Sequence, residues 1–163
     1  MAALLRPKGG PGGRANQKRQ RDQVVADGNG LPVAVLLDSA QKAEIQLAQE
    51  TLGLVWVPKN GPGRPKTRPK ELVADRGYDS QTFRTHLRRR GIHPCIPERR
   101  GRKPRPGRKP DTSSYRLRWI VERTLAWLGN FRRLVVRYER HLSVYQGFFN
   151  LACIFILLNK LLQ

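Results

Sequence analysis

Acidic residues are scarce in this sequence. Only 12 of its 163 residues are Asp or Glu, against 32 Lys and Arg, which gives a formal net charge of +20. Such an excess is typical of proteins that bind a polyanion. Cysteine is also scarce, because Cys95 and Cys153 are the two in the chain and neither has a Cys or His partner at metal-ligand spacing. We therefore expect no disulfide framework and no zinc site, and a cytoplasmic protein.

Long hydrophobic runs are missing as well. The most apolar segment, 147–162, is interrupted by Asn150, Asn159 and Lys160 and is shorter than the roughly 20 residues that a transmembrane helix needs. The sequence therefore favours a buried terminal helix and no membrane partner. Residues 1–5 are too few for the apolar part of a secretory signal. A hydrophobic fraction of 39% nevertheless allows a folded core and excludes wholesale disorder.

Proline and glycine are concentrated together with the basic residues. The segment 6–21 is made almost entirely of these types and cannot bury enough apolar surface to fold. We therefore expect a flexible basic arm over 1–22, followed by one compact domain over 23–163. Two further segments of this composition, 58–70 and 97–110, are expected to be basic loops of that domain.

The remaining patterns alternate between strand and helix. Two apolar runs flank the turn Asp27-Gly28-Asn29-Gly30, which predicts a β-hairpin. Strands are then expected at 71–75 and 92–96, and helices before Gly53 and at 80–90, 111–128 and 142–162. The segment 131–140 fits either a helix or a strand. This order predicts an α/β (α+β) fold with a mixed sheet, flanking helices and a helical C-terminus.

Two carboxylates stand out as candidate metal ligands. Asp75 ends a predicted strand, and ligands of open α/β sheets gather at the carboxyl ends of strands. A lone Asp in that place can equally cap the turn that follows. Glu122 lies within a predicted helix, where the simplest interpretation is a solvated residue or a partner of Arg118 four positions earlier.

A longer motif gives Glu122 a second interpretation. Tyr115, Arg118 and Glu122 fall on one stripe of a helix, at positions i, i+3 and i+7. Together with VADRGYDS (73–80), RRRGIHPCIP (88–97), DGNGLPVAVLL (27–37) and the closing apolar helix, the segment 115–140 resembles the DDE transposases of bacterial insertion sequences, of the four/five superfamily. These enzymes have a ribonuclease H-like catalytic domain, and the resemblance extends from Lys8 to the end of the chain.

The resemblance implies a two-metal phosphoryl-transfer site in which three carboxylates hold two Mg²⁺, with Mn²⁺ as an alternative. By position, Asp75 matches the second aspartate of the family and Glu122 its glutamate, while Tyr115 and Arg118 match residues that contact DNA. The family often has a further basic residue seven positions after the glutamate. Gly129 stands there in this chain, so that contact is either lost or taken over by Arg132 or Arg133.

The opening of the sequence departs from the family. The first catalytic aspartate should lie on the opening strand, shortly before Lys8, and so at about Met1 or just before it, but no aspartate occurs before Asp22. We therefore expect an incomplete ribonuclease H-like fold, the C-terminal portion of a transposase that lacks its first strand and first aspartate. Such a chain would be a truncated or split form, completed by an upstream-encoded segment or working as a homo-oligomer.

Three functions compete. The leading one is transposition, in which the chain binds insertion-sequence ends and target DNA in the bacterial cytoplasm, at the nucleoid, and cleaves and joins strands. The second is charge-driven, non-catalytic DNA binding, as a competitor of a full transposase. In either case Arg64, Lys66, Arg102 and Lys103 resemble short minor-groove hooks, although solvated cationic loops have the same composition. The third, an RNA-packing protein, gives no reason for the stripe that contains Glu122.

Overall fold

A computed structural model describes residues 1–5, 20–39, 42–98, 118–136, 138–139 and 141–162. Its centre is one five-stranded mixed sheet with the strand order β3-β2-β1-β4-β5. Strands β1 and β4 are parallel, as are β4 and β5, whereas β2 is antiparallel to both β1 and β3. The strands are β1 (Ala2–Leu5), β2 (Gln20–Asp27), β3 (Pro32–Ser39), β4 (Glu71–Val73) and β5 (His93–Cys95).

The helices agree with the predicted order. They are α1 (Glu44–Gly53), the 3₁₀ helix η1 (Arg76–Tyr78), α2 (Gln81–Arg89), α3 (Arg118–Gly129), α4 (Arg132–Val135) and α5 (Leu142–Leu161). The α/β class, the mixed sheet, the flanking helices and the helical C-terminus are therefore confirmed. The ambiguous segment 131–140 contains the short helix α4. Most of the predicted loop 97–110, and the start of the helix predicted at 111, lie outside the described residues.

Strand β1 is the main correction to the sequence analysis. Residues 2–5 were assigned to a basic arm, and the opening strand of the sheet was expected to be missing. Instead Ala2–Leu5 form the central strand, with Leu4 and Val25 fully buried on either side of the β1–β2 pairing. A run of four apolar residues is too short to predict a strand by itself. The strands with which it pairs lie about twenty and seventy positions away in the sequence. Residues 20–22, also assigned to the arm, belong to β2.

The turn between β2 and β3 is built by its own side chains. Asp27 accepts hydrogen bonds from the backbone N–H groups of Asn29 and Leu31, both at 2.8 Å. Gly30 has a φ of +84°, and a Cβ there would lie 3.1 Å from the Thr124 hydroxyl of α3. That hydroxyl donates to the Gly30 carbonyl at 2.6 Å. The hairpin turn, predicted from glycine and aspartate, thus also anchors α3.

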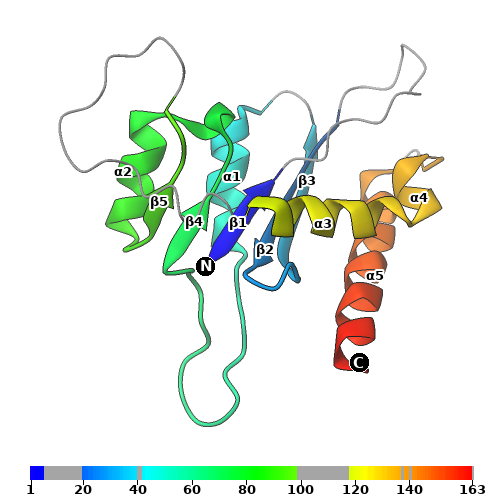
Figure 1. Cartoon of the computed structure of the whole chain (residues 1–163). Coiled ribbons are helices and arrows are strands. Elements are labelled where there is room, and N and C mark those ends of the chain that lie inside the picture. The colour runs from blue at the N-terminus through cyan, green and yellow to red at the C-terminus, as the bar shows by residue number, and fades with distance from the viewer. Residues whose placement is uncertain (6–19, 40–41, 99–117, 137, 140, 163) are drawn as a thin grey trace.

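Each face of the sheet is covered by its own set of helices (Figure 1). Side chains alternate between the two faces along a strand, so Leu4 and Leu72 pack with α1 and α2 while Ala3 and Val73 lie on the opposite face. On that opposite face, α3 runs across the sheet and α5 packs against β2 and β3 through Phe149 and Ile156 among others. The result is three layers, with helices on both sides of the sheet.

Helix α5 is only half buried. Tyr145, Phe149, Ala152, Cys153 and Ile156 face the core, whereas large apolar side chains on the other side are exposed. The prediction of a buried terminal helix is therefore correct for one face of the helix alone. By length and composition this one helix of the described chain could cross a membrane, although 28% of its apolar window is buried within the fold.

Burial makes a testable prediction for the thiols. Burial raises the pKa of Cys153 to about 12, and Cys95 is also buried. Because the thiolate is the nucleophile, we expect negligible reaction of the folded protein with Ellman's reagent at pH 7. On unfolding in guanidinium, both thiols should react and release two equivalents of thionitrobenzoate per chain. Immediate reaction of either thiol in the native protein would show that the interior is open to the reagent.

Candidate functional site

Asp75 lies at the carboxyl end of β4, as its position in the sequence predicts. Its side chain caps η1 and accepts a hydrogen bond from the Arg76 N–H at 2.6 Å. The residue is half-buried, and Ala74 before it is buried. Both the turn-capping role and an accessible carboxylate at the end of a strand are thus present together.

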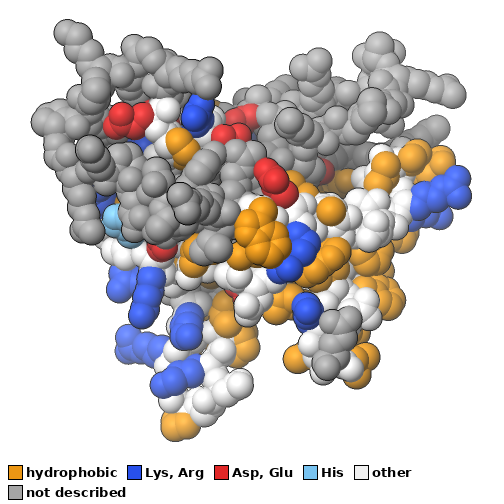
Figure 2. All heavy atoms as spheres, in the orientation of Figure 1, with side chains coloured by type: hydrophobic (Ala, Val, Ile, Leu, Met, Phe, Trp, Pro, Cys, Tyr) orange, Lys and Arg blue, Asp and Glu red, His pale blue; other side chains and the backbone are white. Residues whose placement is uncertain are grey.

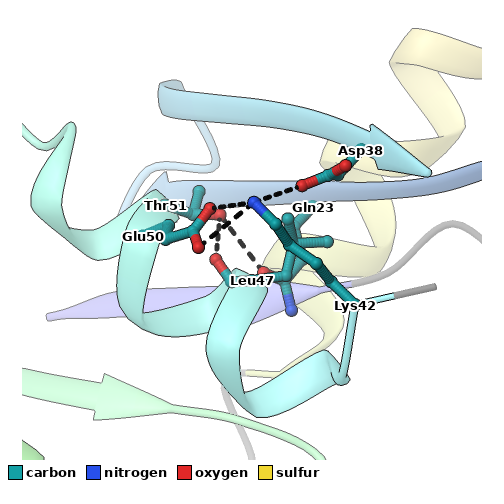
Figure 3. A network of polar contacts seen from close by, with 6 residues as sticks. All are labelled: Gln23, Asp38, Lys42, Leu47, Glu50 and Thr51. Atoms are coloured by element: carbon teal, nitrogen blue, oxygen red, sulfur yellow. Dashed lines mark hydrogen bonds and ion pairs between the residues drawn. The ribbon is translucent and has the colours of Figure 1, made fainter. Parts of the chain in front are cut away.

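The segment after Asp75 is fixed by a buried polar network. Tyr78 is 3% exposed, and its hydroxyl accepts a hydrogen bond from the Gln23 amide at 2.7 Å. Gln23 also donates to the Glu44 carbonyl at 3.2 Å and accepts from Thr51 at 3.2 Å. Figure 3 shows Gln23 reaching from β2 toward Thr51 of α1. One glutamine therefore ties β2 and α1 to the turn that carries Asp75.

A second network holds the other side of the same turn. Asp79 is buried and accepts a hydrogen bond from Arg84 Nε at 3.0 Å. Arg84, also buried, donates from Nη2 to the Ile96 carbonyl just after β5 at 2.5 Å. The Arg84 guanidinium thus joins α2, the Asp75 turn and the end of β5. These roles were not predicted, because Arg84 reads in the sequence as one of many basic residues.

The network predicts a stability effect for Gln23. We expect Gln23→Leu to lower the free energy of unfolding by about 1–3 kcal/mol, because the Tyr78 hydroxyl and the Thr51 hydroxyl lose a buried partner. Urea denaturation followed by circular dichroism measures this change. The matched control is Gln146→Leu, which removes a half-buried glutamine whose hydrogen bond to Asn150 is exposed to solvent, and should change stability by about 0.5 kcal/mol or less. Equal effects of the two substitutions would contradict the assigned role of Gln23.

Glu122 is exposed on α3, on the same side of the sheet as Asp75. One turn after Glu122, Leu125 packs against a cluster that contains Ala3 and Val73. Val73 lies on that face, so alternation along the chain directs Asp75, two residues later, to the same side. Figure 1 shows α3 crossing the sheet over β1, the neighbour of β4. The structure therefore brings both predicted carboxylates to one face of the sheet.

Two tryptophans flank the guanidinium of Arg123, the residue that follows Glu122 in the sequence. Arg123 lies 4.9 Å from the ring centres of both Trp119 and Trp127, and it donates to the Asn29 carbonyl at 2.8 Å. Trp119 is 53% exposed. The helical spacing of four on either side of Arg123 is the signal in the sequence for this arrangement.

The predicted cations of loop 58–70 lie elsewhere. Arg64 and Lys66 precede β4, whereas Asp75 follows it, so the loop and Asp75 are at opposite ends of the sheet. Figure 1 shows this loop extending away from the sheet at the amino end of β4. Arg64 and Lys66 are therefore separated from Asp75 by the length of β4.

The other predicted contacts are dispersed. On α4, Arg133 pairs with Glu139 at 2.9 Å and lies over the rings of Tyr138 and Phe148, which is a structural role. Arg132 of the same helix is exposed. Residues Tyr115, Arg102 and Lys103 lie outside the described residues, and Arg118 is described only as the first residue of α3.

Asp75 and Glu122 are the type of ligand that a divalent cation prefers, but two carboxylates are fewer than the three expected. Carboxylate oxygens are the ligands that Mg²⁺ and Mn²⁺ prefer. Within the described part of the chain, however, no cluster of three or more ligating side chains is found. Strand β1 consists of Ala and Leu. In its pairing with β4, Ala2 lies opposite Leu72 and Ala3 opposite Val73, two residues before Asp75.

Comparisons with known proteins agree with the motifs. Residues 6–157 match the family model described as "Transposase DDE domain". The chain is also 36% identical over 157 residues to a Burkholderia cepacia protein described as "Putative transposase for insertion sequence element IS402". That alignment covers 96% of this chain and 71% of the relative.

Proposed function

Since the chain belongs to the DDE transposase family, we propose that it acts on DNA at insertion-sequence ends through a metal site formed by Asp75 and Glu122. The observation that carries the proposal is the placement of these two carboxylates on one face of the sheet, at the end of β4 and on the helix that crosses β1. When bound, a divalent cation would supply charge stabilisation at the phosphate that is cleaved. We expect the protein in the bacterial cytoplasm, where its DNA lies.

The chain's own residues would position the DNA and the cation. The Asp75 carboxylate is oriented by the Arg76 N–H, and the turn beneath it is fixed by Gln23 and Arg84. Trp119, which is exposed one turn before Glu122 on α3, offers an aromatic face to a base. Arg118, at the start of the same helix, is proposed to contact a phosphate as well.

Among the residues that the structure describes, Asp75 and Glu122 would form an incomplete triad. We propose that strand cleavage and transfer require a third carboxylate from outside this chain, either from a separate segment or from another copy. The apolar composition of β1 supports this view. It also favours the second candidate function, in which the chain binds DNA without cutting it and competes with a full transposase.

Electrophoretic and strand-cleavage assays on the element's terminal repeats distinguish these possibilities. With Mn²⁺ or Mg²⁺, we expect the chain to bind the DNA more tightly than in EDTA, and Asp75→Asn or Glu122→Gln to remove that gain. A metal-independent affinity would contradict the proposed site and favour the competitor. Nicking by the wild-type chain alone, abolished in Asp75→Asn, would show that no third carboxylate is needed.

A further inference from the structure

The basic residues at the amino end of β4 and β5 form one surface. Loop 58–70 enters β4 there, and α2, which runs back along the sheet, ends beside it. Figure 2 shows basic side chains gathered over this part of the molecule. We call this region the amino-edge surface, and its exposed cations are Lys59, Arg64, Lys66, Lys70, Arg88 and Arg89.

These cations are not neutralised by acidic neighbours. Within the described residues, none of the six forms an ion pair with a carboxylate. The nearby Glu71 lies 3.8 Å from His93 instead. Like charges at this density repel one another, and an anion that bridges them relieves the repulsion. A solvated surface without a ligand would more often intersperse both signs.

Loop 58–70, which carries four of the six cations, is held in place. Val57 and Lys66 exchange two backbone hydrogen bonds at 2.9 and 2.8 Å, which close the loop at its base. Arg68 donates to the Arg90 carbonyl at the end of α2 at 2.6 Å. The loop and the end of α2 are therefore joined, and the cations keep a fixed spacing. Binding to them costs less conformational entropy than ordering a free arm would.

The amino-edge surface is too far from Asp75 to contact the same phosphates. Lys70 precedes Asp75 by five positions, which corresponds to about 16 Å along an extended strand. This distance spans about five base pairs at 3.4 Å per step. A phosphate close to Asp75 therefore leaves the amino-edge surface free for other DNA.

We propose that the amino-edge surface binds the phosphate backbone of duplex DNA at least about five base pairs away from the DNA at Asp75 and Glu122. The inference rests on the proposed function in taking DNA as the partner. The surface contributes affinity and orientation, and it takes no part in the chemistry. Closely spaced, ordered cations with few sequence-reading groups suit backbone contacts.

Affinity measurements test the charge of this surface. The variant Arg64→Gln/Lys66→Gln/Arg88→Gln/Arg89→Gln is compared with Lys42→Gln/Lys160→Gln. This control removes the exposed Lys160 of α5 and Lys42 before α1, which is ion-paired with Asp38 and Glu50. On a 30-base-pair duplex, we expect the first to lower affinity at least tenfold at 100 mM salt and to reduce the salt slope by about 3, since each phosphate contact contributes about 0.9. The control should change the slope by less than about 0.5, well below the roughly 1.8 that two lost phosphate contacts would give. If the two variants reduce the salt slope by the same amount per charge removed, the proposal is overturned.

A tethered cleavage reagent tests the location. Because both native cysteines are buried, Asn60→Cys at the loop tip can be labelled selectively with iron-EDTA. Cutting of the bound duplex from Asn60→Cys, and much weaker cutting from the labelled control Ser143→Cys at the start of α5, is expected. No cutting from residue 60 would overturn the proposal. So would binding to phosphatidylserine vesicles with no binding to the duplex.

The two proposals fail separately. If Mn²⁺ has no effect on DNA affinity but cutting from residue 60 and the reduced slope are observed, the metal site is wrong and the amino-edge surface stands. If Asp75→Asn removes the metal-dependent gain in affinity while the variant with four substitutions binds DNA like the wild type, the proposal for the amino-edge surface is wrong and the proposal for the metal site stands.

Discussion

Replacing Leu5 by aspartate is expected to raise the affinity of the chain for Mn²⁺ by roughly tenfold to a hundredfold. Ala3 of β1 pairs with Val73 of β4. If this register is continued by two residues, residue 5 falls level with Asp75, and the alternation of a strand would put a carboxylate there on the face that α3 crosses. A third oxygen ligand with a negative charge strengthens a hard-cation site. Isothermal titration calorimetry with Mn²⁺ measures the change, and circular dichroism verifies the fold.

The gain must depend on Asp75 if the carboxylates share a cation. In Asp75→Asn/Leu5→Asp, we expect the affinity to fall back to that of Asp75→Asn or close to it. A gain of the same size in the presence and absence of Asp75 would show that residue 5 binds the metal elsewhere. Residue 5 and Asp75 would then not bind the same cation.

Removing Arg84 is expected to have the largest effect on stability. We predict that Arg84→Leu lowers the free energy of unfolding by about 3–5 kcal/mol, because it leaves the buried Asp79 carboxylate without its charged partner. It also leaves the Ile96 carbonyl without its donor. Thermal and urea denaturation measure the loss.

Arg88 provides the matched control on the same helix. It lies one turn after Arg84 and is exposed, so Arg88→Leu should change stability by about 0.5 kcal/mol or less. If Asp79 is responsible for the penalty, Asp79→Asn/Arg84→Leu should be more stable than Arg84→Leu alone. A double variant that is less stable would assign the effect to lost packing instead of an unpaired charge.

Local patterns predicted the elements well. The turn Asp27-Gly28-Asn29-Gly30 fixed the hairpin, Gly91 ended α2, and Asp75 fell at the end of β4 because these features depend on neighbouring residues. The helical spacing of apolar residues also located α3, and the apolar run near the end of the sequence located α5. Long-range partners could not be predicted in the same way. The four residues of β1 become a strand only through pairing with β2 and β4, and loop 58–70 is placed at the far edge only by the direction of β4.

The candidate site shows the same division. Asp75 and Glu122 were singled out by motif and resemblance, and the structure places both on one face of the sheet. Arg84 and Gln23, which hold the turn beneath Asp75, were not singled out because their importance arises from burial, and burial of a polar residue has no signal in its own sequence neighbourhood. Arg123 became visible only when α3 placed it between two tryptophans.

The account depends most on Asp75 and Glu122 sharing one divalent cation. Calorimetric titration of Mn²⁺ into the wild type, Asp75→Asn, Glu122→Gln and the double variant tests this directly. We predict that either single substitution weakens binding at least tenfold and that the second adds little to the first, since the ligands serve the same ion. Binding that is unaffected by Glu122→Gln, or losses that are simply additive, would contradict a shared site.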